Sequence, residues 1–201
     1  MRSTAEEPLL LLGCGILQKE IRFLIEKNGW QMETLFLDSA LHIDFDKLSR
    51  ALTSALEQNR ERQSIVFYGS CHPLMEEILA SAGTFRSVGQ NCVEMLFGGE
   101  RFTGFLEQGA FFLLEDWARR WDRIVTATFG PNREVMREII RGDRSYLLCI
   151  TTVCSGDFRA EAEEAGRTVG LPVRWLNVSL DHLEAVLQEA IDRKQRERHH
   201  A

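Results

Sequence analysis

The sequence predicts an α/β protein, a parallel sheet flanked by helices in a Rossmann-like arrangement. Apolar segments of strand length alternate with segments whose apolar residues recur at helical spacing. Three such strand-helix units follow one another directly, and this order is typical of parallel sheets covered by helices. With 201 residues and 44% hydrophobic composition, the chain can form a core that needs no disulfide or metal.

The first half supplies the three consecutive units. Its predicted strands are PLLLLG, METLFLDS and SIVFYGS. The helices that follow them carry apolar faces formed by Leu17, Ile21, Leu24 and Ile25, by Leu48, Leu52, Ala55 and Leu56, and by Leu74, Met75, Ile78, Leu79 and Ala82. Asn28-Gly29 ends the first helical pattern.

The second half predicts a smaller α/β unit. CVEMLFGG indicates a helical stretch, and the aromatic segment RFTGFLEQGAFFLLEDW has no clear period. The remaining elements are a helix with Val135, Met136, Ile139 and Ile140, the strand SYLLCITTV, a helix over 159–169, the strand VRWLNVS and a final helix with Leu183, Val186, Leu187, Ala190 and Ile191. We predict an N-terminal half over 1–109, a C-terminal half over 110–194 and a solvated polar tail over 195–201. Two similar halves and one continuous sheet both fit this pattern.

Composition argues against several classes of protein. The net charge is −6 and no basic stripe is present, so nucleic acid is not an expected partner. No apolar run reaches the roughly 20 residues that cross a bilayer, and MRSTAEEP lacks the features of a secretion signal, so we expect a cytoplasmic protein with no membrane segment. Five cysteines without a CxxC pair argue against a disulfide framework.

Cysteine and histidine follow the first three predicted strands. Cys14 follows the first strand, His42 the second, and Cys71 the third, while Cys92 lies in the next turn. Because the carboxyl ends of parallel strands meet at one edge of a sheet, we expect these side chains to converge. Thiolates and imidazoles bind zinc or an iron-sulfur cluster. The sequence therefore predicts a metal site made by Cys14, Cys71 and Cys92, with His42 as a fourth ligand or a supporting donor.

Three further residues are candidates for supporting this site. Glu20, Glu94 and His72 could orient the ligands through hydrogen bonds. Each also has a structural interpretation, since surface glutamates are common and His72 precedes Pro73 where a helix could begin. Unpaired cysteine is often a core residue, and Cys149 within YLLCITT fits that interpretation. The aromatic residues Phe111, Phe112, Trp117 and Trp121 are also expected in the core.

Familiar catalytic motifs are missing from the sequence. It contains no GxSxG, no P-loop and no HExxH, and GCG is not followed by the spacing of a dinucleotide fingerprint. A cysteine paired with a histidine, such as Cys71 with His42 or His72, could form an activated thiolate. A cysteine-nucleophile enzyme acting on a small molecule is therefore the alternative to a metal site.

Taken in order, five motifs resemble an uncharacterised domain-of-unknown-function family of bacterial and archaeal proteins. They are CGILQKE, LHIDFDKL, FYGSCHP, NCVEMLFGG and GAFFLLEDW, and they include Cys14, Glu20, His42, Cys71, Cys92 and Glu94. The sequence departs from the family pattern at three places. His72 stands where the family more often has glycine, Val93 stands where it has an aromatic residue, and Leu114-Glu115 stands where it has Thr-Asp.

That family is often associated with corrinoid methyltransferase systems. The resemblance implies a role in corrinoid-dependent one-carbon methyl transfer, with a corrinoid protein or methyltransferase subunit as partner and a small methyl donor or acceptor as substrate. The chain has no DxHxxG-type loop for cobalamin, so a metal is favoured over a directly bound corrinoid. A non-catalytic partner or chaperone of a methyltransferase, docking through the aromatic middle region, is a third hypothesis.

Overall fold

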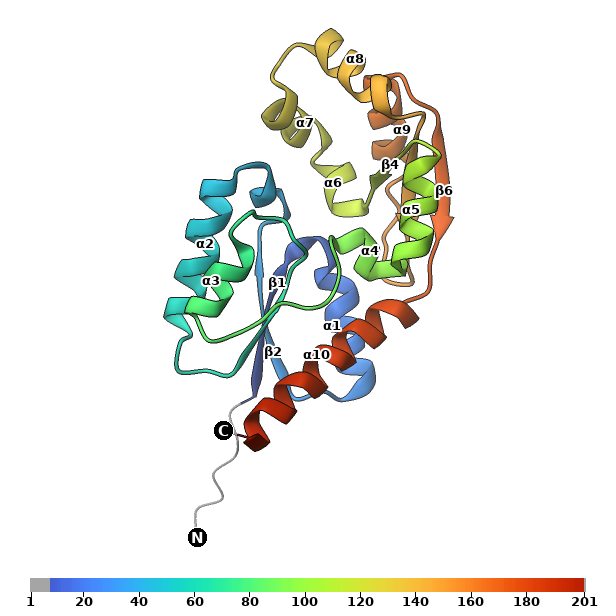
Figure 1. The fold of residues 1–201 in the computed structure, drawn as a ribbon. Coiled ribbons are helices and arrows are strands. Elements are labelled where there is room, and N and C mark those ends of the chain that lie inside the picture. The colour runs from blue at the N-terminus through green and yellow to red at the C-terminus, as the bar shows by residue number, and fades with distance from the viewer. Residues whose placement is uncertain (1–7, 201) are drawn as a thin grey trace. The chain divides into compact units, whose positions relative to one another are not determined.

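A computed structural model describes the backbone of residues 8–200 and the side chains of residues 8–197. The chain forms two compact units, one made of Met1–Met95 and Leu183–Ala201 and the other of Leu96–His182 (Figure 1). The ranges predicted from the sequence are 1–109, 110–194 and 195–201; in the structure, residues 96–109 group with the second unit and residues from Leu183 onward with the first. The segment MRSTAEEP, which lacks the features of a secretion signal, lies outside the described residues except for Pro8.

The first unit contains a parallel three-stranded sheet. Its strands are β1 (Leu9–Cys14), β2 (Met32–Leu37) and β3 (Ser64–Phe67), in the order β2-β1-β3. β1 is central and almost completely buried, as its continuous apolar sequence predicts for a strand covered on both faces. A parallel bridge between Val66 and Arg86 adds a short extended segment beside β3.

Helices cover both faces of this sheet. They are α1 (Gln18–Asn28), α2 (Phe45–Gln58), α3 (Met75–Ser81), α4 (Cys92–Phe97) and α10 (Asp181–His200), with short 3-10 helices η1 (Gly15–Leu17) and η2 (Ser39–Ile43). α2 and α3 pack on the face that carries Leu12 and Val66, and α1 and α10 lie on the opposite face (Figure 1). Asp44 caps α2 by accepting a hydrogen bond from the Lys47 amide at 3.0 Å.

The second unit contains its own parallel sheet. The strands are β4 (Ala110–Leu113), β5 (Tyr146–Thr151) and β6 (Val173–Asn177), in the order β4-β5-β6. Its helices are α5 (Gly99–Glu107), α6 (Glu115–Arg119), α7 (Trp121–Phe129), α8 (Arg133–Asp143) and α9 (Arg159–Val169). The fold class predicted from the sequence is confirmed, as two separate three-stranded sheets flanked by helices.

Two segments differ from the sequence-based expectation. The aromatic segment without a clear period contains α5, β4 and α6, and the strand was missed because its apolar run is only four residues long. The predicted polar tail continues α10 as a helix. Just before this tail, the Arg193 guanidinium lies 3.7 Å from the ring centre of Phe85 and Lys194 is buried beside it, so aliphatic stems cover apolar surface while the charges stay at its edge. Within the described chain, no helix is long and apolar enough to cross a membrane.

The two sheets differ in how the chain passes through them. In the first sheet, β2 lies on one side of the central strand β1 and β3 lies on the other side, so the strand order reverses at β1. In the second sheet, each strand lies beside the strand that precedes it in the sequence, so the strand order does not reverse. Ligands of open α/β sheets bind where the strand order reverses, beyond the carboxyl ends of the strands. The ends of β1 and β3 are therefore the place where a binding site is expected.

A close backbone approach brings the start of α4 to this place. The Ser70 amide donates a hydrogen bond of 2.8 Å to the Gln90 carbonyl. A Cβ atom on Gly69 would lie 2.5 Å from the Gln90 carbonyl carbon and 2.6 Å from the Asn91 Cα. Only glycine leaves room for this approach, because the obstructing atoms belong to the backbone and cannot rotate away.

We predict that Gly69→Ala destabilises the protein by about 1–3 kcal/mol, since overpacking against backbone forces a shift. Gly104→Ala is the matched control, because the space around Gly104 in α5 is open; it should be neutral or stabilising by up to about 1 kcal/mol. Urea unfolding measures both. Equal stabilities of the two variants would show that the approach at Gly69 is not tight.

Candidate functional site

Cys14 and Tyr68 are neighbours on one face of the first sheet. β1 pairs with β3 so that Leu12 lies opposite Val66 and Gly13 opposite Phe67. Cys14 and Tyr68 are the next residues of the two segments, and the Cys14 thiol interacts with the Tyr68 hydroxyl, so the two side chains lie close together. Both belong to the apolar cluster under α2 and α3, and they are 4% and 2% exposed. One thiol and one phenol therefore lie side by side where β1 and β3 end.

Cys92 reaches the same cluster from the start of α4. The Asn91 side chain caps this helix by accepting hydrogen bonds from the amides of Val93 at 3.0 Å and Glu94 at 2.9 Å. The Glu94 carboxylate accepts a further bond from the Gln90 amide at 3.1 Å. These bonds hold the turn that presents Cys92, and they give Glu94 a structural role at the site.

Arg86 fastens the loop that leads to Cys92. Its Nη1 donates to the carbonyls of Ser87 at 3.1 Å and Gly89 at 2.7 Å, and its Nε donates to Glu76 Oε1 at 2.6 Å. The guanidinium also acts electrostatically on Cys71 and favours its charged form. Arg86 thus links the loop geometry to the charge at the site.

The three predicted thiols interact with one another. Cys71 and Cys92 pack against the cluster that contains Cys14. Burial and then the Cys14 thiol raise the pKa of Cys71 from 9.0 to about 11. A hydrogen bond with Cys14, followed by burial, raises the pKa of Cys92 well above its ordinary value. At neutral pH, Cys71 and Cys92 are therefore protonated, and a protonated thiol is a poor nucleophile.

Tyr68 is a member of the site that the sequence analysis did not single out. Its hydroxyl is fully buried, and the Cys14 thiol lies close enough to act on it through a hydrogen bond that falls short of ideal geometry. Burial raises its pKa, and the Cys14, Cys92 and Cys71 thiols raise the pKa further. The signal in the sequence is weak, because a tyrosine at the end of an apolar strand has the pattern of a core residue.

The thiols do not form a closed ligand set in this structure. Among the residues whose side chains are described, no group of three histidine, cysteine, aspartate or glutamate side chains is arranged to hold a metal ion. Thiolate sulfur is a donor type that soft cations prefer, so the chemistry of the three cysteines suits such an ion although their arrangement in this structure does not form its site.

His42 lies on η2, directly after β2. Burial lowers the pKa of its imidazole, and a hydrogen bond with the Ser39 backbone acts in the opposite direction. The ring is therefore neutral at pH 7, the form in which histidine binds metals. Its role as the fourth ligand stays a prediction.

His72 and Glu20 are both buried. The Leu74 amide donates a 3.0 Å hydrogen bond to His72 Nδ1, and the ring packs edge-on against Phe45 with centres 5.6 Å apart. His72 therefore shapes the turn before α3, which begins at Met75 and not at Pro73. Glu20 lies in the first turn of α1. The supporting roles of His72 and Glu20 stay predictions.

Cys149 and Trp121 are buried in the core of the second unit, as expected. Phe111 and Trp117 are partly buried against the same core, and Phe112 is partly buried on the other face of the sheet. Docking of a partner through the aromatic middle region stays a prediction. Cys154 is partly buried in the loop after β5.

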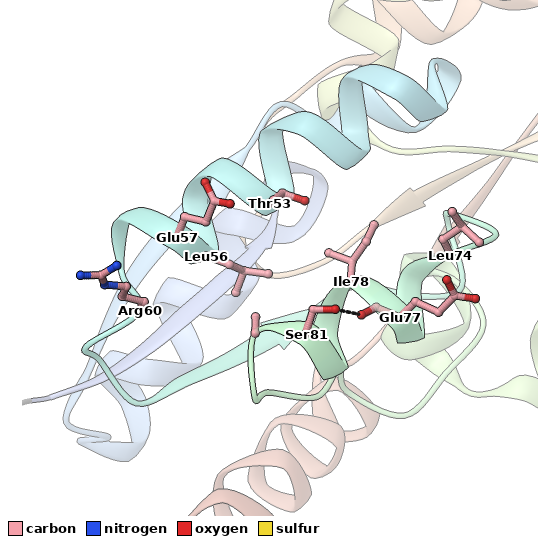
Figure 2. A pocket seen from close by; sticks show the side chains of 9 residues that line it. Thr53, Leu56, Glu57, Arg60, Leu74, Glu77, Ile78 and Ser81 are labelled. Atoms are coloured by element: carbon pink, nitrogen blue, oxygen red, sulfur yellow. Dashed lines mark hydrogen bonds between the residues drawn. The ribbon is translucent and has the colours of Figure 1, made fainter.

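A groove lies between α2 and α3, and Figure 2 shows its lining. Leu56, Leu74 and Ile78 form its apolar part, and charged side chains such as Glu57 and Arg60 border it. Ser81 donates a hydrogen bond of 2.8 Å to the Glu77 carbonyl at its edge. No cysteine lines the groove, so it is separate from the candidate site.

Sequence comparison matches residues 36–187 to the model of a family described as a protein of unknown function, DUF1638. The matched range includes His42, Cys71 and Cys92, while Cys14 precedes it. No curated protein and no solved structure gives a significant match. The predicted resemblance to an uncharacterised family is confirmed, and the match carries no information on corrinoid chemistry.

We predict that the metal-free protein loses stability as the pH rises above 9. The pKa of Cys71 is about 11 when folded and 9.0 ordinarily, so its contribution is complete below pH 9 and disappears as the pH rises through 11. Two pKa units correspond to about 2–3 kcal/mol. Urea unfolding with a chelator present, at pH 8 and pH 11, should show a smaller alkaline loss for Cys71→Ala than for the wild type. Equal losses would contradict the raised pKa.

Proposed function

The chain belongs to the DUF1638 family of proteins of unknown function, and from this premise we propose that it binds a metal ion or iron-sulfur cluster through Cys14, Cys71 and Cys92. The observation that carries the proposal is the gathering of three thiols and a buried hydroxyl where the strand order of the first sheet reverses. His42 is the proposed fourth ligand or supporting donor.

The charge pattern of the cluster supports a cation as ligand. Each thiol disfavours ionisation of its neighbours, so the charged forms are unstable without a compensating positive charge. A bound divalent cation reverses this effect, because it deprotonates coordinating thiols. Sulfur ligands favour zinc and iron-sulfur clusters over magnesium or calcium. The donor set therefore matches soft metals.

The methyl-transfer part of the proposal is supported by the motif order described for the sequence. Zinc at a thiolate site lowers the pKa of a substrate thiol and so activates it as a methyl acceptor. In that setting the three cysteines hold the ion, and the apolar walls formed by α2 and α3 limit access of water to it. The corrinoid would arrive on a partner protein. A reducing cytoplasm, where free thiols persist, is part of the same proposal.

A cysteine-nucleophile enzyme is the weaker alternative. Its nucleophile needs a thiolate at neutral pH, and the pKa of both Cys71 and Cys92 is raised instead of lowered. A non-catalytic partner or chaperone of a methyltransferase is the other alternative, and it does not by itself account for three converging thiols. Neither alternative is favoured by a specific observation.

We predict that anaerobically purified protein contains close to one zinc per chain, or iron together with inorganic sulfide. Cys71→Ser should lose most of the metal because it removes one of the three sulfur donors. Cys154→Ser is the matched control, since Cys154 lies outside the proposed set. Elemental analysis with a sulfide assay measures all three proteins. Metal-free wild type that also takes up no added zinc or iron with sulfide would overturn the proposal.

We further predict that the zinc-loaded protein accelerates methyl transfer from methylcobalamin to a thiol acceptor. The cobalamin absorbance reports the loss of the methyl group. Cys71→Ser should show only the uncatalysed rate, whereas Cys154→Ser should match the wild type. Metal-loaded wild type that reacts no faster than the uncatalysed control, with or without a corrinoid protein, would contradict the methyl-transfer role while leaving metal binding intact.

A further inference from the structure

Cys14 and Cys92 are far apart in the sequence, but backbone hydrogen bonds hold them at the same end of the first sheet. Cys14 is the last residue of β1, which pairs with β3. Just beyond β3, the Ser70 amide donates a 2.8 Å hydrogen bond to the Gln90 carbonyl, and α4 then begins at Cys92. Both cysteines pack in the same apolar cluster. The backbone therefore brings these two side chains to one place.

The Cys14 and Cys92 thiols share a hydrogen bond. This bond raises the pKa of Cys92, so Cys92 donates and the Cys14 sulfur accepts, because a donated bond favours the protonated form of the donor. The Tyr68 hydroxyl acts on the same sulfur in the same sense. Cys71 interacts with Cys14 through charge, and its own hydrogen bond is with the Gly69 backbone. Cys92 is therefore the thiol that contacts the Cys14 sulfur directly.

These contacts give the two sulfur atoms different chemical roles. Hydrogen-bond donors beside Cys14 stabilise its thiolate, which is the form of a thiol that attacks an oxidant. Cys92 keeps its proton and lies next to the sulfur that reacts first. Redox-sensitive cysteines are often placed beside a second cysteine that resolves the oxidised form. A bond that is made and broken in this way differs from a structural disulfide, which needs an oxidising compartment to persist.

We propose that Cys14 and Cys92 form a reversible disulfide when the protein meets hydrogen peroxide. The Cys14 sulfur attacks the peroxide, an S–O bond forms as the O–O bond breaks, and the leaving oxygen departs as water with the thiol proton. The Cys92 sulfur then attacks the Cys14 sulfur, the S–S bond forms as the S–O bond breaks, and a second water takes the Cys92 proton. The two sulfur atoms together lose two electrons, and the peroxide gains them.

This inference goes beyond the proposed function, because the disulfide forms without a metal. The bond would also remove two of the three proposed sulfur ligands from a metal ion. Oxidation and metal binding therefore exclude each other at this site, and a dithiol that reduces the bond restores the free cysteines.

The test treats the reduced chain with a small excess of hydrogen peroxide in the presence of a chelator and then alkylates it in denaturant. The wild type should lose the mass of two hydrogen atoms, and three of its five cysteines should alkylate. Digestion should yield a peptide pair joined through Cys14 and Cys92, and dithiothreitol should restore all free thiols. Cys92→Ala should lose this peptide pair. Cys71→Ala and Cys154→Ala are the matched controls and should both keep it.

The peptide map of the wild type decides the outcome without any variant. Treated protein in which every cysteine still alkylates overturns the inference, and so does a bond from Cys14 to Cys71 or between two chains. Protein that forms the Cys14–Cys92 bond but takes up no zinc or iron overturns the proposed function alone. Protein that binds metal through its cysteines but forms no such bond overturns this inference alone.

Discussion

The approach of the Gln90 backbone to Gly69 is the constraint on which the candidate site depends. β1 and β3 end beside each other, and the Cys14 thiol interacts with the Tyr68 hydroxyl there. Cys92 belongs to a segment that follows the short bridge beside β3, and the Gln90 carbonyl holds this segment close by accepting a hydrogen bond from the Ser70 amide, next to a residue without a side chain. Arg86 and Glu94 then fix the returning turn through three carbonyl and amide bonds. The positions of the thiols are therefore set mainly by backbone hydrogen bonds.

Much of the fold could be predicted from the sequence because its signals are local. Apolar runs and helical periods located β1, α2 and α9, and the rule for parallel strands predicted that Cys14 and Cys71 would converge. β4 is too short to stand out from its aromatic neighbours, and the end of α10 has a polar composition that hides its packing on Phe85. Tyr68 could not be identified because its interaction with the three thiols is a property of the folded environment and not of the residue type.

The groups of the site disfavour one another's ionisation. Burial raises the pKa of the Cys71 thiol and of the Tyr68 hydroxyl, and neighbouring thiols raise both pKa values further. A charge on either group is therefore unfavourable both because of burial and because of the groups beside it. A buried polar atom without an ideal hydrogen bond is not peculiar to this place, since Arg120, Trp121 and Thr168 in the second unit have one as well.

The return of α10 to the first sheet has a consequence for how the chain reaches this structure during synthesis. Leu9, Ile65 and Phe85 are covered by Ala190 and Ile191, so this face of the first sheet stays open until nearly the whole chain has left the ribosome. The intervening unit, Leu96–His182, contains all three strands of the second sheet. It can therefore fold before the first unit is complete. Contacts between such distant parts of a chain form slowly and leave apolar surface exposed in the meantime. Truncation within the last helix should thus affect the first-made strands more than the residues next to the cut.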